Sequence, residues 1–531
     1  KMSIANAEWS KAGPMLEADS LKIGVDLGAL LRGDIHIKAL EAVAPRIILE
    51  RARDGRVNWF AGEATGGNSN ALAVSLDRAL IKNGSLKYVD HETGKSQSFS
   101  RVDMDLRWPD YKGAADIELV LRPAGADVTL TGKVFEFAQF LAGDVSPLNV
   151  AIRTSGGTAK FTGRGGIAPE AAGTLEIEAS DVAALVAALG GSGGLPAELG
   201  RGLSLTGTAT LTRAQQLSLR EAVVTVSDMR FAGNADIVLG AKPNVTANLA
   251  TSALDLSRFS GSGSGSGGEG WSTAPIDAGG LAAFDGKVAI SAASLKAAGM
   301  SFGKTSILMT LDNARAVFSL RELQGYGGGF GGDFVMNNRN GLSVGGTLSA
   351  KGVEVRDVLG DLAGVTRLSG PASGQIKFLA VGNSMAKIMN SLKGQGQVAM
   401  GAGAISGFDL QRLMRAEDGR GGATGFDSMS ATFTITDGVL SNNDWVVSMP
   451  DVTATGEGRV GIGGRTIDYL FTPNALMARG GRGLAVPVRI RGPWAAPKIT
   501  ADIAKAIDLN LAEEKKKVED KAKAKIEGAV A

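Results

Sequence analysis

The stretch RVDMDLRW, residues 101–108, alternates strictly between charged and apolar side chains. In an extended chain the apolar residues Val102, Met104, Leu106 and Trp108 point to one side, and the charged residues point to the other. A period of two with charges on one side is typical of a strand in a sheet with one dry face and one wet face. The stretch therefore predicts such a sheet.

The same alternation recurs in ADIELVLR (115–122), GTLEIEA (173–179) and PVRIR (487–491). Helical patterns are few and short, and they follow strands. Several of them carry Asp or Ser at the N-cap position and end at Gly. They cover residues 26–33, 180–191, 254–261, 355–364, 384–394 and 408–415. The chain is thus predicted to repeat, loosely, a group of strands and then a short amphipathic helix.

The composition of the 531-residue chain agrees with many short strands joined by glycine-rich turns, since it holds 75 glycines and only 5% aromatic residues. The net charge of +2 gives no electrostatic footprint for binding nucleic acid. Cysteine is absent, which excludes disulfides and leaves the compartment open.

One segment, SGSGSGSGGEG at residues 260–270, has the composition of a flexible linker. We therefore expect a first β region over residues 1–259, a second over 271–500, and a charged tail over 501–531. The tail is polar all round, which favours a solvated helix over a helix that binds a partner.

No targeting or membrane-spanning segment is visible in the sequence. No stretch approaches the ~18 apolar residues that span a bilayer. The opening KMSIANAEWSKAGP lacks the apolar core of a signal peptide. The chain is therefore either cytosolic or a fragment that begins downstream of its targeting segment.

The predicted helices are too few to cover the dry face of so many strands. Either two sheets pack face to face, or one curled sheet keeps a concave apolar face that binds something apolar. We predict a mainly β fold: a long curled antiparallel sheet that forms an elongated apolar groove, with short amphipathic helices between groups of strands. Asp54-Gly55 lies between two strand-like stretches and predicts a hairpin of this sheet, with a type I′ turn in which both central residues have φ > 0.

The search for catalytic chemistry finds little. The two histidines, His36 and His91, are predicted to be exposed and non-catalytic, and no spacing typical of a metal site or an activated nucleophile occurs. The sequence around Gly303-Lys304-Thr305 has Ala298 where a phosphate-binding loop needs glycine. The glycine-rich GYGGGFGG (325–332) is followed by a strand pattern, so the helix that would bind a pyrophosphate is missing. We expect no catalytic residue, no metal and no cofactor.

Several motifs, taken in order, resemble the AsmA family of bacterial envelope proteins. Residues 26–59 carry a short helix ending in "LL-x-G", then "P-x-I-x-L-E" and "DG-x-x-NW", and residues 80–106 carry a "G-x-L-x-Y-x-D" hairpin. Residues 271–304 and 320–341 are similar to the central part of the family, and residues 374–413, 436–471 and 486–499 to its C-terminal part. Family members usually begin with a membrane helix and further strands, so we expect a truncated or processed chain.

The resemblance implies a periplasmic protein that is held in the inner membrane by an anchor absent from this chain. It also implies a non-enzymatic carrier that moves phospholipid along an apolar β-groove towards the outer membrane and supports outer-membrane integrity. Outer-membrane or periplasmic proteins are further candidate partners. The alternative is an envelope scaffold or assembly factor for outer-membrane proteins, which bound lipid in the purified protein would distinguish from a carrier.

The residues predicted to form the floor of the groove are the apolar members of the alternating strands; the other interpretation of each is a dry sandwich core. They are Ile35, Ile37, Val102, Met104, Leu106, Ile117, Leu119, Leu121, Leu175, Ile177, Val488 and Ile490.

Overall fold

The computed structural model describes residues 2–28, 36–59, 75–92, 94–189, 202–257, 270–409, 420–450, 452–475, 487–502, 504, 505 and 507. The protein is mainly β with a few short helices, as predicted. Thirty of the described strands belong to one curled sheet, and three form a small second sheet. The chain divides into two compact units, residues 1–249 and 250–531. This division falls before the predicted linker, which apart from Gly270 lies outside the described residues, as does most of the predicted tail.

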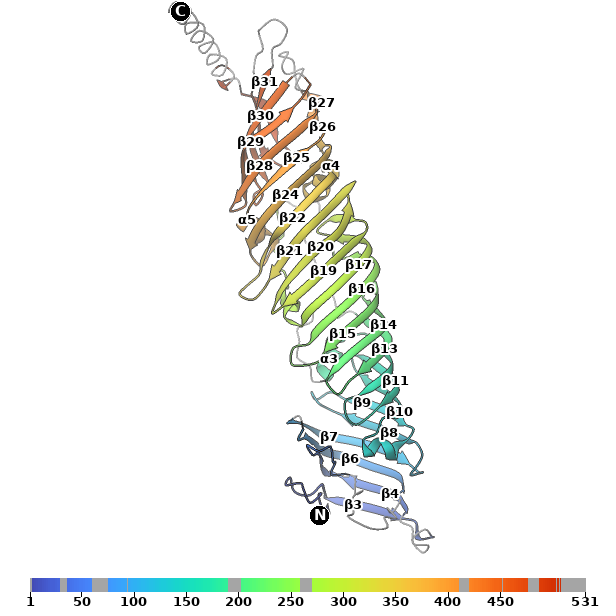
Figure 1. Ribbon diagram of the computed structural model, residues 1–531. Coiled ribbons are helices and arrows are strands. Elements are labelled where there is room, and N and C mark those ends of the chain that lie inside the picture. The colour runs from blue at the N-terminus through green and yellow to red at the C-terminus, as the bar shows by residue number, and fades with distance from the viewer. Residues whose placement is uncertain are drawn as a thin grey trace, which may run out of the picture. The chain divides into compact units, whose positions relative to one another are not determined.

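Among its described residues, the first unit contains fifteen whole strands and the helices α2 and α3, and the strand β16 (Asn244–Asp255) crosses its boundary. The elements are β1 (Met2–Ile4), β2 (Leu16–Ala18), β3 (Ser20–Val25), β4 (His36–Val43), β5 (Arg46–Arg51), β6 (Ser75–Asp90), β7 (Lys95–Trp108), β8 (Ala115–Leu121), β9 (Val128–Val134), α2 (Phe137–Ala142), β10 (Ser146–Thr154), β11 (Gly157–Gly165), β12 (Ala171–Ala179), α3 (Val182–Ala188), β13 (Leu203–Leu211), β14 (Gln216–Val226) and β15 (Met229–Val238). From β6 to β15 each strand pairs antiparallel with the next, and Figure 1 shows them side by side in chain order.

The turn at Asp54-Gly55 is present, but it does not form the predicted hairpin. Gly55 has a φ of +86° whereas Asp54 has no positive φ, so the type I′ prediction is wrong. The returning chain meets β5 in a single bridge, Arg51 to Val57. Instead, β5 pairs in parallel with the second half of β6, while β4 pairs in parallel with the first half. The long strand β6 thus pairs with β4 along its first half and with β5 along its second half. β5 therefore has a strand partner without the predicted hairpin.

The predicted helices fare unevenly. Those at residues 180–191, 355–364 and 384–394 are confirmed as α3, α4 (Val355–Ala363) and α5 (Met385–Ser391). The prediction at 254–261 is wrong at its start, because Leu254 and Asp255 belong to β16. Those at 26–33 and 408–415 fall mostly outside the described residues.

The second unit continues the antiparallel sheet and adds the small one. Its elements are η3 (Gly279–Ala282), β17 (Asp285–Ala297), β18 (Met300–Phe302), β19 (Thr305–Asp312), β20 (Arg315–Gly325), β21 (Gly328–Asn337), β22 (Ser343–Glu354), α4, β23 (Leu368–Ser369), β24 (Pro371–Val381), α5, β25 (Lys393–Met400), β26 (Gly403–Phe408), β27 (Arg420–Phe426), β28 (Ser428–Thr436), β29 (Val439–Ser448), β30 (Val452–Gly461), β31 (Thr466–Ala475), β32 (Val488–Pro493) and β33 (Lys498–Ala501). β23, β26 and β27 make the small sheet.

Phenylalanine and glycine face each other across the strands of this unit. Phe378 lies between Gly346 of β22 and Gly394 of β25, and Phe433 of β28 lies opposite Gly396. A Cβ atom on Gly396 would come within 2.5 Å of the Phe433 ring and 2.4 Å of a backbone oxygen. The glycines therefore make room for aromatic rings on a tightly curled face.

We predict that Gly396→Val destabilises the second unit by about 1–3 kcal/mol, because the added atoms collide with a ring and with backbone. Gly331→Ala on β21 is the control, since its Cβ would have no neighbour closer than 3.7 Å. Urea unfolding followed by circular dichroism measures both. Equal midpoints for the two variants would contradict this account of the glycines.

Candidate functional site

The candidate site is the apolar face of the sheet in the first unit. One residue from each strand from β6 to β15 lies in direct register with the next, and all ten are apolar. This central row consists of Ile81, Met104, Leu119, Leu130, Ile152, Ala159, Ile177, Leu205, Val224 and Phe231. Three residues predicted from separate stretches of sequence, Met104, Leu119 and Ile177, thus come into one line.

A second row runs beside the central one on the same face. It consists of Ala79, Leu106, Ile117, Gly132, Val150, Phe161, Leu175 and Gly207. It contains three more of the predicted residues, Leu106, Ile117 and Leu175. The two rows together make a broad apolar band without a charged side chain.

Most of the band is only half-buried. Met104, Leu119, Leu130 and Ile152 all keep part of their surface accessible, whereas Val102, one pleat further along β7, is 5% exposed. Side chains in the middle of a sandwich core would be as buried as Val102. The described residues therefore leave the middle of this face partly open.

Two helices border the band at opposite ends of the strands. α2 lies beside the start of β10, where Phe137 packs against Leu148 and, edge to face at 5.0 Å between ring centroids, against Trp108. α3 lies beside the other end of β10, because the Asp181 amide donates to the Gly156 carbonyl in the turn after that strand. The apolar band thus has a helix at each border, and we call the band between them the trough.

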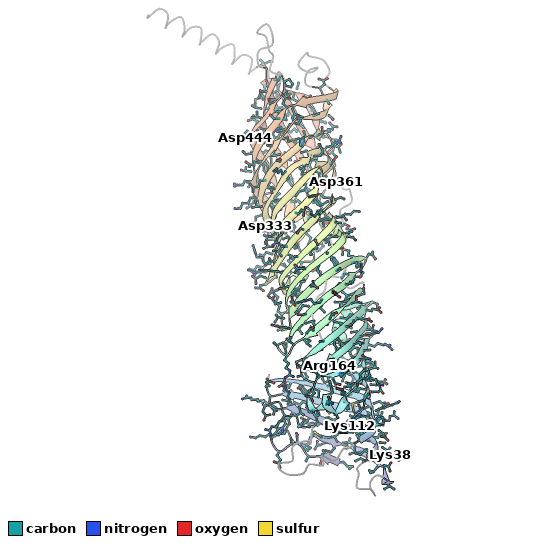
Figure 2. The ribbon with its side chains drawn as sticks, turned by 45° about the vertical axis from the view of Figure 1, so that its right-hand side comes forward. Lys38, Lys112, Arg164, Asp333, Asp361 and Asp444 are labelled. Atoms are coloured by element: carbon teal, nitrogen blue, oxygen red, sulfur yellow. The ribbon has the colours of Figure 1, made fainter. Side chains whose placement is uncertain are left out.

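The opposite face of the sheet is charged. Arg78 makes a two-point hydrogen bond to Asp105, at 2.7 and 3.0 Å, and this bond lowers the pKa of Asp105. At the ends of the strands, Arg213 and Glu170, each in a connection between two strands, form a similar pair at 2.6 and 2.8 Å. Charged side chains such as Arg164 mark this face in Figure 2. Such exposed pairs add little stability, but they keep the outer face wet.

The remaining predicted residues lie elsewhere. Ile35 falls outside the described residues. Ile37 is aligned with Leu76 of β6, next to the Trp108 cluster, and Leu121 is aligned with Val128 at the end of β8. Val488 and Ile490 belong to the second unit, where they line an apolar cavity beneath the small sheet.

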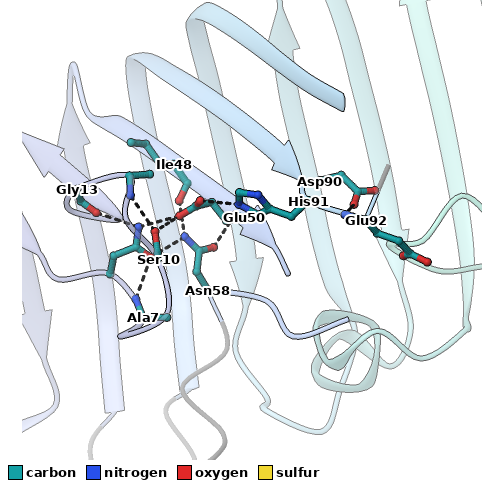
Figure 3. Close-up of polar contacts among 11 residues, drawn as sticks. Ala7, Ser10, Gly13, Ile48, Glu50, Asn58, Asp90, His91 and Glu92 are labelled. Carbon is teal, nitrogen blue, oxygen red and sulfur yellow. Dashed lines mark hydrogen bonds and ion pairs between the residues drawn. The ribbon is translucent and has the colours of Figure 1, made fainter. Parts of the chain in front are cut away.

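Sequence reasoning missed a polar cluster around Glu50, which Figure 3 shows. The Glu50 side chain is 3% exposed and accepts hydrogen bonds from Ser10 and from Asn6, the latter at 3.1 Å. His91 contacts the other carboxylate oxygen at 3.0 Å. Burial raises the pKa of Glu50, but the hydrogen bonds from Ser10, His91 and Asn6 together outweigh it, so the pKa is lowered. The cluster fastens the N-terminal segment to β5.

Asn58, of the "NW" motif, completes this cluster by acting as a substitute strand. Its side-chain oxygen accepts from the Glu50 amide at 2.8 Å, and its side-chain nitrogen donates to the Ile48 carbonyl at 2.8 Å. These are the backbone groups that a neighbouring strand would otherwise bind. The motif therefore closes the edge of β5. The sequence showed the motif itself, but it did not show that Asn58 binds the backbone of β5.

We predict that Glu50→Gln removes a pH-dependent part of the stability of the first unit. Because the folded-state pKa is lowered below the unfolded value of about 4.3, this contribution is fully present above that pH and is lost as the pH falls through the folded pKa. The variant should be less stable than the original protein at pH 7, and the difference should shrink towards pH 3.

Urea midpoints measured by tryptophan fluorescence between pH 3 and 7 test this. Glu118→Gln, on the exposed face of β8, is the matched control and should leave the profile unchanged. An unaltered pH profile in Glu50→Gln would show that the carboxylate does not stabilise the fold.

Both phosphate-loop lookalikes lie at connections between strands, but the glycine-rich stretch was predicted to be a turn, and its residues 328–332 instead begin β21. Gly303 and Lys304 connect β18 to β19, and Lys304 contacts Glu322 at 3.1 Å. Tyr326 and Gly327, with φ of 56° and 76°, connect β20 to β21. In the described part of the chain, no three His, Cys, Asp or Glu side chains could hold a metal ion. Nor does any helix among those residues have the length and apolar character to cross a membrane.

Comparison with known proteins agrees with the order of the motifs. The model of the AsmA family matches residues 204–445. Protein AsmA of Escherichia coli (strain K12) is 22% identical over 353 residues, which cover 57% of this chain and 55% of that protein, so the chain spans about half the length of this relative. No solved structure matches. The family model covers less than half of the chain, and together with the E. coli relative it shows that this part of the chain is similar to the AsmA family.

Proposed function

We propose that the protein is a non-enzymatic carrier that moves phospholipid along the apolar face of its sheet, between the inner and outer membranes. Similarity to the AsmA family supports a function in the bacterial envelope, and that family is not known as a family of enzymes. Location in the periplasm and attachment to the inner membrane belong to the same proposal. The observation that carries it is the central row, which stays apolar and in register across ten strands.

The row has the right chemistry for acyl chains. Each methylene that leaves water contributes roughly 0.8 kcal/mol, and the row offers apolar surface over nine steps of ~4.8 Å, or roughly 43 Å. Because neighbouring positions of the row are similar, an acyl chain that shifts from one strand to the next loses little binding free energy. No charged side chain interrupts this path.

The trough also separates the two parts of a phospholipid. The half-buried middle, at residues such as Leu119 and Leu130, would contact acyl chains, while α2 and α3 guide them at the borders. The head group would remain at the polar margin, where water is available. Because the other face of the sheet is charged, water hydrates it, and the protein stays in solution while lipid covers the apolar face.

We predict that Met104→Asp and Leu130→Asp each leave the protein folded but abolish phospholipid binding along the row. Because solvent reaches a carboxylate on an open face, the free energy of unfolding should change little. In a sealed core, an unpaired charge would lower it by several kcal/mol. Native mass spectrometry of the purified full chain measures bound phospholipid, and urea unfolding measures stability.

Thr129→Asp is the matched control, because it lies next to Leu130 on β9, points to the other face and is aligned with Arg153. Arg107 suits this purpose less well, since it pairs with Asp105 at 3.5 Å. Unfolding by Met104→Asp or Leu130→Asp, but not by Thr129→Asp, would favour a sandwich core. Bound protein clients in place of lipid would favour the alternative role as an assembly factor.

A further inference from the structure

The small sheet of β23, β26 and β27 covers the apolar face of the second unit at one place. Between the two lies a cavity of about 60 Å³. Ile405, Thr424 and Phe426 line it from the small sheet, which we call the roof. The larger sheet, with the residue that follows β29, forms the floor and contributes Val447, Met449, Ala454, Phe471, Val488, Ile490 and Ile499.

We infer that this space is a binding site for a single alkyl chain, and that the roof opens to admit it. The inference rests on the proposed function and adds to it a place where a chain is covered on two sides. Thr424 is the only lining residue that can form a side-chain hydrogen bond, and no lining residue is charged. Such a lining recognises hydrocarbon and rejects a head group.

The floor of the cavity continues the apolar face of the second unit. Ala372, Met400, Met429, Val447 and Ala454 lie in direct register on five neighbouring strands of the floor. All five are buried in one cluster with Phe426 of the roof, so an alkyl chain reaches this row, which no polar side chain interrupts, only when the roof separates from the floor.

The contacts between roof and floor permit opening. The strands of the roof pair with one another, and none of the described strand pairings joins them to the floor. Backbone bonds occur where the roof connects to the floor, such as Val355 to Gly370 at 3.1 Å and Asp427 to Ser448 at 2.8 Å. In between, side chains such as Phe426, 3% exposed, supply the contact. Parting the two layers breaks apolar contacts but no ladder of hydrogen bonds.

The packing around the cavity requires this movement. Val447 and Phe426, which line it from the floor and the roof, are 2% and 3% exposed. Because the lining is apolar, the space offers water no hydrogen-bond partner and is expected to stay dry. A chain therefore enters only when the roof separates from the floor.

The test uses a phospholipid with a photoreactive diazirine at the end of one acyl chain. The chain has no cysteine, so Thr424→Cys with Ile490→Cys can be bridged by a short bis-maleimide to hold the roof on the floor. After irradiation, labelled peptides are identified by mass spectrometry. The unbridged protein should be labelled on floor peptides that contain Val447 or Val488 and on first-unit peptides that contain Met104; the bridge should reduce floor labelling at least tenfold and spare the Met104 peptide.

A second variant does not depend on the bridge. Ala454→Val, at a position 3% exposed, fills the cavity with apolar atoms and should reduce floor labelling. Ala399→Val is its control, since Ala399 is exposed and lies next to the inward-facing Met400 on β25. Both variants should bind phospholipid on the first unit as before.

The outcomes separate this inference from the proposed function. Labelling of the first unit without the floor overturns the cavity site and leaves the carrier role intact. Undiminished floor labelling in the bridged protein overturns the opening of the roof. Absence of labelling throughout the chain overturns the carrier role and the cavity site together.

Discussion

The structure depends on register between neighbouring strands. Since side chains alternate with a period of two, a slip of one residue would turn a whole strand's charged side chains into the trough. Where the alternation of inward-facing and outward-facing side chains falls out of step with the neighbouring strand, an extra residue restores it. Between Leu219 and Ala222 of β14 the register shifts, and Glu221 there has a φ of 50°; a similar shift between Ala350 and Val353 contains Gly352. Bulges of this kind keep apolar residues on one face while the strands bend.

The curvature of the sheet limits the space for side chains on its concave side, and glycine residues provide that space. On the concave side of a curled sheet the side chains of adjacent strands converge. Pairing of Phe433 with Gly396 fills this space with one ring where two ordinary side chains would collide. In the second unit, the rings of Phe378 and Phe433 each face a glycine on a neighbouring strand, whereas Phe161 of the first unit faces Val150 and Leu175.

The sequence predicts which face of each strand is apolar, because apolar and polar residues alternate within the strand itself. For that reason six predicted residues fall into two adjacent rows.

The features that the sequence did not predict depend on contacts between residues far apart in the chain. α2 has no side-chain N-cap and is held by packing of Phe137 on Trp108, which no local pattern indicates. The Glu50 cluster joins residues 40 or more positions apart, and Asn58 takes the place of the hairpin strand that Asp54-Gly55 suggested. The small sheet escaped prediction because β26 and β27 are glycine-rich and lack alternation.

The two units treat the same kind of apolar face differently, and this difference bears on function. An apolar face that is open along its middle favours association with any apolar surface, so a protein retains one where a ligand is to be bound. In the first unit, Leu119 and Leu130 remain half-buried between bordering helices. In the second, the small sheet seals the face around Val447, which is 2% exposed. Because the roof is attached by side-chain packing, sealing and access can alternate there, while the first unit remains accessible without any movement.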